Sequence, residues 1–172
     1  MNNFELNKFT PETLQATNDN WLAIAGEDEY LAEYFRLFKN IEPSIKDKHI
    51  HYESVYYGLF ENNNGYASSI IEIVTSKKPK GVMTKVLNIF VTPKFSDLIQ
   101  FNSEFTKIYI NTLLESLKLS QSTTEGYQLK IYGRTNDFLT TLYAIHVKLS
   151  QNKIDGIKSV SMQGRFLMIE HN

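Results

Sequence analysis

The stretch from residue 127 to residue 149 constrains the fold of this chain more than any other part of it. Residues 127–133 read Tyr-Gln-Leu-Lys-Ile-Tyr-Gly, a strand-like run that stops at Gly133. Residues 136–150 follow at once with apolar side chains on one helical face. Asn136 stands where the strand-like run gives way to the helical run, and Tyr143 follows seven residues later on the helix. A strand that leads directly into an amphipathic helix predicts a sheet covered by helices.

The remaining segments extend this unit into a mixed sheet. Runs rich in aromatic and β-branched residues predict strands, and apolar residues three and four apart predict helices. The predicted elements are strand 4–9, helices 10–24 and 27–38, a hairpin over 51–75, strand 85–91, helix 101–119, strand 127–133, helix 136–150, and strands 158–162 and 165–170. This order, β-αα-β-β-β-α-β-α-β-β, predicts one α/β (α+β) domain over residues 1–172, with a mixed sheet flanked by helices.

Local signals predict where several elements end. Thr10 predicts the N-cap of the first helix, with Pro11 in its first turn, and Gly26 predicts its end. Pro43 closes the second helical region, and residues 76–81 predict a solvated loop. On helix 101–119 the residues predicted to face inward are Phe105, Ile108, Tyr109, Leu113 and Leu117.

Composition excludes several classes of protein. The chain has 172 residues, the size of one domain, and a hydrophobic content of 42% with 10 Tyr and 11 Phe predicts a globular core. The 18 basic and 19 acidic residues are mixed along the sequence, so there is no basic footprint for nucleic acid or an anionic membrane. The absence of cysteine excludes disulfides, thiolate catalysis and cysteine-based zinc sites.

The sequence carries no signal for export or membrane insertion. Residues 1–8 lack the basic segment and apolar run of a signal peptide. The longest apolar runs are a few residues, far short of the roughly 20 that cross a bilayer. We therefore expect a soluble, cytoplasmic protein without a membrane partner.

Three features in their order along the chain are similar to the Gcn5-related N-acetyltransferase (GNAT) superfamily. The family's fourth strand often ends in a Val-x-Pro turn, and residues 90–93 here read Phe-Val-Thr-Pro. Its fifth strand often leads to an Asn with a Tyr seven residues later, as Asn136 and Tyr143 do here, with Leu142 before the Tyr. The final hairpin, ending at residues 166–170, matches the family's last strands in position. The chain thus resembles a diverged GNAT protein over most of its length.

The resemblance implies an acetyl-CoA-dependent N-acyltransferase. Tyr143 would protonate the leaving thiolate, because a phenol at the end of a rigid ring suits that role. The backbone N–H of Val91 would polarise the thioester carbonyl, with Phe90 beside it on the fourth strand. Asn136 would orient a cofactor amide or a base, and Arg134 would contact a phosphate beside a helix N-terminus. The acceptor would be a small-molecule or protein amine.

A general base is harder to identify from the sequence. Strand 85–91 contains no carboxylate, so Glu72 and Glu53 on the neighbouring hairpin are the nearest acids. His51 and His146 have suitable unperturbed pKa values. The histidines lack the spacing of a helical metal site, so we expect no metal.

One departure from the family favours a second hypothesis. The family's glycine-rich loop after the fourth strand, which binds the pyrophosphate of coenzyme A, is replaced by residues 94–104 without any glycine. Asp97 and Glu104 in this segment would repel the anion. The alternative function is an inactive GNAT-fold binding or structural module, of virus or phage origin, that has lost this loop.

Each candidate residue also has a structural alternative. Tyr143 could be a core aromatic of its helix, and Asn136 could be the N-cap of that helix. Glu72 could be a solvated strand residue, and the lysines at 77–80 a solvated hairpin tip. The aromatic-rich helix at 30–38 could support a homodimer if its second face is exposed.

Overall fold

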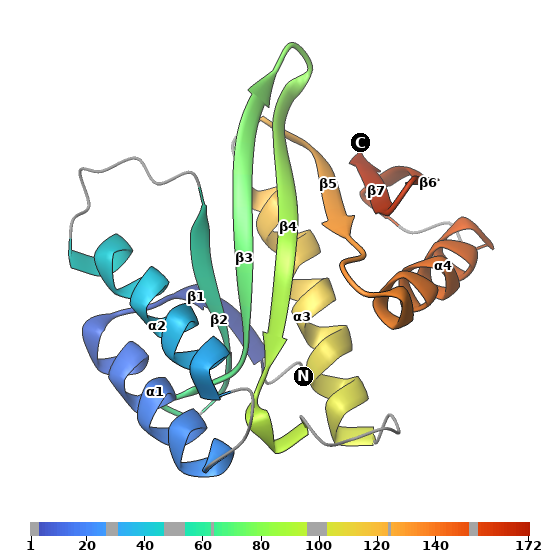
Figure 1. The fold of residues 1–172 in the computed structure, drawn as a ribbon. Helices are drawn as coiled ribbons and strands as arrows, with labels where there is room; N and C mark the ends of the chain where they lie inside the picture. Colours follow the sequence, from blue (N-terminus) through green and yellow to red (C-terminus); the bar gives the residue numbers. More distant parts are fainter. Residues whose placement is uncertain are drawn as a thin grey trace. The chain divides into compact units, whose positions relative to one another are not determined.

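The structure, a computed structural model, describes residues 4–26, 31–46, 54–62, 64–95, 103–123, 125–151 and 155–172. These ranges contain seven strands and four α-helices (Figure 1). The strands are β1 (Phe4–Lys8), β2 (Val55–Glu61), β3 (Ala67–Lys78), β4 (Gly81–Val91), β5 (Gly126–Tyr132), β6 (Ile157–Gln163) and β7 (Phe166–His171). The helices are α1 (Pro11–Ala25), α2 (Leu31–Lys46), α3 (Ser103–Ser122) and α4 (Asn136–Gln151), with a 3₁₀ turn at Pro93–Phe95.

The strands follow the order β1-β2-β3-β4-β5-β7-β6. β4 and β5 are parallel, whereas β1 with β2, β5 with β7 and β6 with β7 are antiparallel. The predicted mixed, mostly antiparallel sheet with helices is confirmed, and so is the predicted order of elements. None of the helices in the described ranges combines the length and apolar character needed to cross a bilayer.

The chain divides into two compact units, and β3 and β4 run through both. Unit 1 comprises residues 1–71 and 89–115, and unit 2 comprises residues 72–88 and 116–172. The single domain over residues 1–172 stays a prediction.

In unit 1, α1 and α2 lie side by side and bury their apolar faces (Figure 1). As predicted, Thr10 caps α1: its hydroxyl accepts from the Thr13 N–H at 3.2 Å, and Pro11 begins the helix. Trp21 is fully buried, with its ring edge-to-face against Tyr34 and Phe38 at centroid distances of 5.6 and 5.8 Å. These contacts form the centre of the core shared by the two helices.

Two hydrogen bonds to one residue fix the position of α1 on β3. Trp21 Nε1 donates to the carbonyl of Ala67 at 2.8 Å, and Ala67 donates its N–H to Thr17 Oγ1 at 2.9 Å. All three residues are fully buried, so each bond satisfies a group that water cannot reach. The first residue of β3 is therefore held by two side chains of α1.

The buried face of α3 is largely polar, which corrects part of the predicted inward face. Of the residues predicted to face inward, Ile108 is buried, whereas Phe105, Tyr109, Leu113 and Leu117 are only partly buried. The residues buried beside Ile108 on this helix are Asn111, Thr112, Glu115, Ser116 and Ser120. Thr112 shows how such a face is satisfied: its hydroxyl lies 2.7 Å from Ser69 Oγ and donates to the carbonyl of Ile108 at 2.8 Å.

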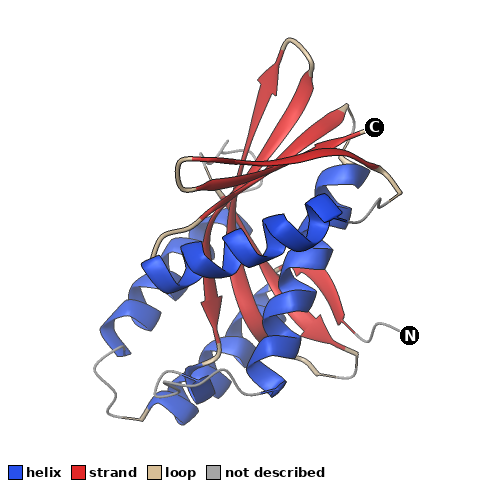
Figure 2. Cartoon of the chain, turned by 90° about the vertical axis from the view of Figure 1, so that its right-hand side faces the viewer, coloured by secondary structure: helices blue, strands red, loops and turns tan. Residues whose placement is uncertain are grey.

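Unit 2 contains β5–β7, α4 and the far halves of β3 and β4. The parallel register joins Val82–Val86 of β4 to Gly126–Ile131 of β5. α4 lies beside the β6–β7 hairpin, as Figure 2 shows. The buried residues of this unit include Ile73, Met83, Val86, Leu129, Ile131, Leu142, Leu167 and Ile169.

Two predicted boundaries are wrong. Pro43 does not close the second helix but lies inside α2, because Ile41 is buried and Ile45 partly buried on either side of it, and this packing offsets the proline's cost. Residues 76–81 are not a loop, because β3 continues to Lys78 and β4 begins at Gly81. The predicted starts at residues 27–30 and 51–53 lie outside the described residues.

Candidate functional site

Three polar side chains of unit 2 form a hydrogen-bonded chain, called here the polar chain. The carboxamide of Asn88 on β4 donates through Nδ2 to Glu72 Oε2 on β3. Through Oδ1 the same carboxamide accepts a hydrogen bond of 2.8 Å from Arg134 Nη1, just after β5. Glu72 and Asn88 are partly buried, and Arg134 is exposed. A carboxylate and a guanidinium are thus held on the two sides of one neutral group.

The turn that carries Arg134 is fixed by a second arginine. Arg165 Nε donates to the carbonyl of Gly133 at 2.7 Å, and Nη2 donates to the carbonyl of Arg134 at 3.1 Å. The backbone N–H of Gly133 donates in return to the carbonyl of Arg165 at 2.8 Å. Sequence reasoning assigned residues 163–166 only to a β-turn. The sequence feature that could have indicated the role of Arg165 is a basic residue at the tip of the last hairpin.

Asn136 is not the N-cap of α4, contrary to the structural alternative above. It is the first residue of the helix, and Thr135 caps it, because Thr135 Oγ1 accepts from the Phe138 N–H at 3.2 Å. Asn136 Oδ1 instead accepts hydrogen bonds of 3.3 and 3.4 Å from the two Nη atoms of Arg165. Thr135 can take the capping position because it reaches the same orphan N–H groups.

Tyr143 is not a core aromatic. It is 47% exposed, whereas its neighbour Leu142 is fully buried and anchors α4. Val147, one turn further on, is 48% exposed, so both side chains belong to an open face of the helix. The Tyr143 hydroxyl is therefore carried on a rigid helix with its ring accessible to a ligand.

Phe90 and Val91 belong to unit 1, at the end of β4. Phe90 packs against the cluster around Trp21, and Val91 packs against the cluster of Phe4 and Ile108. The N–H of Thr92 donates to the carbonyl of Ser68 in β3 at 3.1 Å. Since successive N–H groups of an extended strand point to opposite edges, the Val91 N–H points away from β3.

Two ion pairs lie among the described residues near the end of β4. Lys94 Nζ lies 2.9 Å from both carboxylate oxygens of Glu104, and Lys107 Nζ lies 3.6 Å from Glu61. All four residues line a cavity of about 240 Å³ in unit 1. The cavity therefore carries no net positive charge that would favour a pyrophosphate. Asp97 lies outside the described residues.

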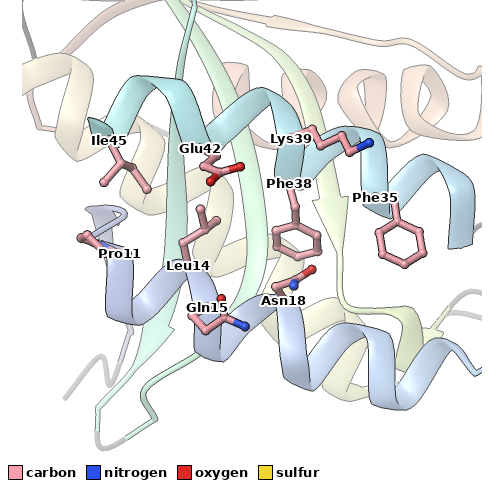
Figure 3. Close-up of a pocket in the computed structure, with 9 residues that line it drawn as sticks. All are labelled: Pro11, Leu14, Gln15, Asn18, Phe35, Phe38, Lys39, Glu42 and Ile45. Atoms are coloured by element: carbon pink, nitrogen blue, oxygen red, sulfur yellow. The ribbon is translucent and has the colours of Figure 1, made fainter. Parts of the chain in front are cut away.

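A second cavity, of about 340 Å³, lies between α1 and α2 (Figure 3). Its lining residues are Pro11, Leu14, Gln15, Asn18, Phe35, Phe38, Lys39, Glu42 and Ile45. Phe35 is 46% exposed at its edge, so the aromatic helix does have an exposed side, and the homodimer stays a prediction.

His51 and Glu53 lie outside the described residues, so their role as a base stays a prediction. His146 is partly buried on α4, and His171 is buried at the end of β7. Among the described residues, no three His, Asp or Glu side chains converge as a metal site would require.

Solved structures with a similar fold are acetyltransferases. A possible acetyltransferase from Clostridium difficile 630 is similar with a TM-score of 0.51 and 11% identity, over 93% of this chain and 99% of that chain. The AtaTR complex bound with acetyl-CoA is similar with a TM-score of 0.53 and 9% identity, over 99% and 95%. A Tyr-to-Phe mutant of the AtaT toxin, bound to the C-terminus of the antitoxin AtaR and acetyl-CoA, has a TM-score of 0.51 and 10% identity, over 98% and 93%.

No family model and no curated protein matches the sequence. At identities near one in ten, the likeness to solved structures is one of fold. It confirms the fold expected from the sequence.

Proposed function

We propose that this chain, which has the fold of the GNAT acetyltransferases, is an acetyl-CoA-dependent N-acyltransferase that acts on an amine. The observation that carries the proposal is that unit 2 contains two accessible side chains of the acid–base type. They are the Glu72 carboxylate and the Tyr143 phenol. Acyl transfer to an amine needs one group that accepts a proton and another that returns one.

Each of the two side chains suits one of these roles. Glu72 would accept a proton from the substrate ammonium, because its carboxylate is positioned by Asn88 and remains partly accessible. Tyr143 would donate its phenolic proton to the sulfur that leaves. One of the similar structures is a Tyr-to-Phe mutant of the AtaT toxin bound to acetyl-CoA, which supports a test of this tyrosine.

Acetyl-CoA would supply an acetyl group activated as a thioester. The backbone N–H of Val91, the last residue of β4, stays the predicted donor to the thioester carbonyl. Phe90, Asn136 and Arg134 stay predicted cofactor contacts. Asn136 and Arg134 both have hydrogen-bond partners within the protein, so a cofactor would share them.

The second candidate is a GNAT-fold module without catalytic activity. It is favoured by the segment after β4, where no glycine permits close backbone approach and where Lys94 is held by both oxygens of Glu104. The cofactor's pyrophosphate would have to displace that carboxylate. The two candidates therefore differ in one measurable property, which is affinity for coenzyme A.

Calorimetric titration with acetyl-CoA and with CoA tests the proposal. Binding at micromolar to submillimolar concentration, followed by release of CoA when an amine is added, is the expected result. No heat and no thermal shift at millimolar ligand would exclude the acyltransferase and leave the inactive module. The variant Glu104→Gln gives a more specific test. It removes the carboxylate that pairs with Lys94, so CoA should bind more tightly to this variant than to the wild type.

A further inference from the structure

We propose that the acceptor is a small zwitterion, an amine that carries a carboxylate two or three bonds from its nitrogen, whose ammonium binds Glu72 and whose carboxylate binds Arg134. The inference rests on the proposed function only in calling this ligand an acceptor. It deepens that function by naming a substrate class.

The first argument is that the polar chain keeps two opposite charges apart. Among the described residues, Glu72 and Arg134 form no direct ion pair, because each is bonded to a different atom of the Asn88 carboxamide. Each charged group keeps a hydrogen bond to a neutral partner and has no opposite charge bonded to it among the described residues. Here a neutral group occupies the space between them, and both charges remain available to a third molecule.

The second argument is the hydrogen-bonding capacity that remains. A carboxylate has about four acceptor positions and a guanidinium has five N–H donors. Asn88 engages one oxygen of Glu72 and one Nη of Arg134. Glu72 can therefore accept from a ligand ammonium, while Arg134 can present a fork of N–H groups to a ligand carboxylate.

The third argument is distance. A carboxamide hydrogen-bonded on both sides separates the two charged groups by on the order of 7 Å. An ammonium and a carboxylate two or three bonds apart cover such a gap with one hydrogen bond at each end. A plain alkylamine would fill only the Glu72 side and leave Arg134 without a partner from the ligand.

The fourth argument is that the cationic side is preorganised. Arg165 holds the carbonyls of Gly133 and Arg134, so the backbone from which Arg134 projects is already fixed before a ligand arrives. Fixing a binding group in advance reduces the conformational entropy lost on binding.

Direct binding tests the inference without acetyl-CoA. The probes are the standard α-amino acids and β-alanine, each paired with its carboxamide, which keeps the amine and removes the negative charge. Thermal shift and calorimetry should show at least one acid that binds at least tenfold more tightly than its own amide. Equal affinity for every acid and its amide, or no binding by any probe, would overturn the proposal.

Substitutions in the polar chain locate the site. Arg134→Gln should weaken binding of that acid at least tenfold and leave binding of its amide unaffected. The affinity of Arg134→Lys for the acid should lie between those of Arg134→Gln and the wild type. Glu72→Gln should weaken binding of both acid and amide. The matched control is Lys158→Gln, which removes an exposed cation of β6 in the same unit and should change nothing. Unchanged discrimination between acid and amide in Arg134→Gln would contradict the assignment.

The outcomes separate this inference from the proposed function. If the acid binds and depends on Arg134 while acetyl-CoA does not bind, the acyltransferase is excluded and the zwitterion site stands. If acetyl-CoA binds and turns over with alkylamines as readily as with every amino acid, the zwitterion site is excluded and the acyltransferase stands.

Discussion

Ser120 Oγ and His171 Nε2 lie 2.9 Å apart, where the end of α3 meets the end of β7 and both side chains are buried. The other ring nitrogen of His171, Nδ1, is buried without a hydrogen-bond partner among the described residues. Burial lowers the pKa of His171 below its ordinary value of 6.5, because desolvation disfavours the charged imidazolium.

The first prediction follows from this lowered pKa. Between 6.5 and the folded pKa, the unfolded state binds more protons than the folded state, so the free energy of unfolding falls as the pH falls. The slope approaches at most about 1.4 kcal/mol per pH unit. Urea denaturation at pH 7.5 and pH 5.5 measures it.

The control for this prediction is His171→Gln, which keeps a hydrogen-bonding group and removes the titration. Its stability should depend less on pH in this range than that of the wild type. Equal slopes in His171→Gln and the wild type would show that another group is responsible.

The second prediction concerns the two bonds between α1 and β3. Thr17→Val keeps the shape of the side chain but leaves the buried N–H of Ala67 without its acceptor, which should cost about 1–3 kcal/mol of unfolding free energy. Thr17→Ser keeps the hydroxyl and should lose less. Chemical denaturation compares the two, and a valine variant as stable as the wild type would be inconsistent with this role.

The third prediction concerns the turn between β3 and β4. Gly81 has φ +130°, and a Cβ there would meet the backbone oxygen of Glu125, which already accepts from the Val82 N–H at 2.7 Å. Gly81→Ala should therefore destabilise the protein by about 2 kcal/mol or more. At Gly65 a Cβ would meet nothing within 4 Å, so Gly65→Ala should be neutral within about 1 kcal/mol. Thermal unfolding of both variants gives the comparison.

The fourth prediction rests on the proposed function. Tyr143→Phe should reduce the rate of acetyl transfer by about a hundredfold or more, because the leaving sulfur loses its proton donor. The ring remains, so the affinity for acetyl-CoA should stay within about twofold by calorimetry. Tyr66→Phe, which removes a hydroxyl in unit 1, is the control. A Tyr143→Phe enzyme with the wild-type rate would exclude the tyrosine as the acid.

The order of elements could be predicted because it depends on local periodicity. Alternation predicts β5, and helical spacing predicts α4, whatever lies around them. The buried face of each helix was harder to predict from the sequence. α3 buries Thr112 and Ser116, and only the Ser69 hydroxyl across from Thr112 explains why a polar residue can face inward there. A hydrogen bond between residues 43 positions apart does not affect the local spacing of apolar residues in the sequence.

The candidate site could be predicted only in part, for the same reason. Glu72, Asn136, Arg134 and Tyr143 were identified individually, by residue type or by resemblance. Asn88 and Arg165 were missed, because their roles depend on partners 46 and 32 residues away. Asn is among the best N-cap residues, which predicts a capping role for Asn136, but Thr135, a less favoured capping residue, takes that position.

The contacts of Arg165 also set an order of assembly during synthesis. A nascent chain that has emerged as far as α4 already contains Glu72, Asn88 and Arg134, but it lacks the arginine that fixes the turn at Gly133. The β6–β7 hairpin must leave the ribosome and pair with β5 before that turn is held. A stalled or truncated translation product would therefore carry the polar side chains of the site without the support that positions them.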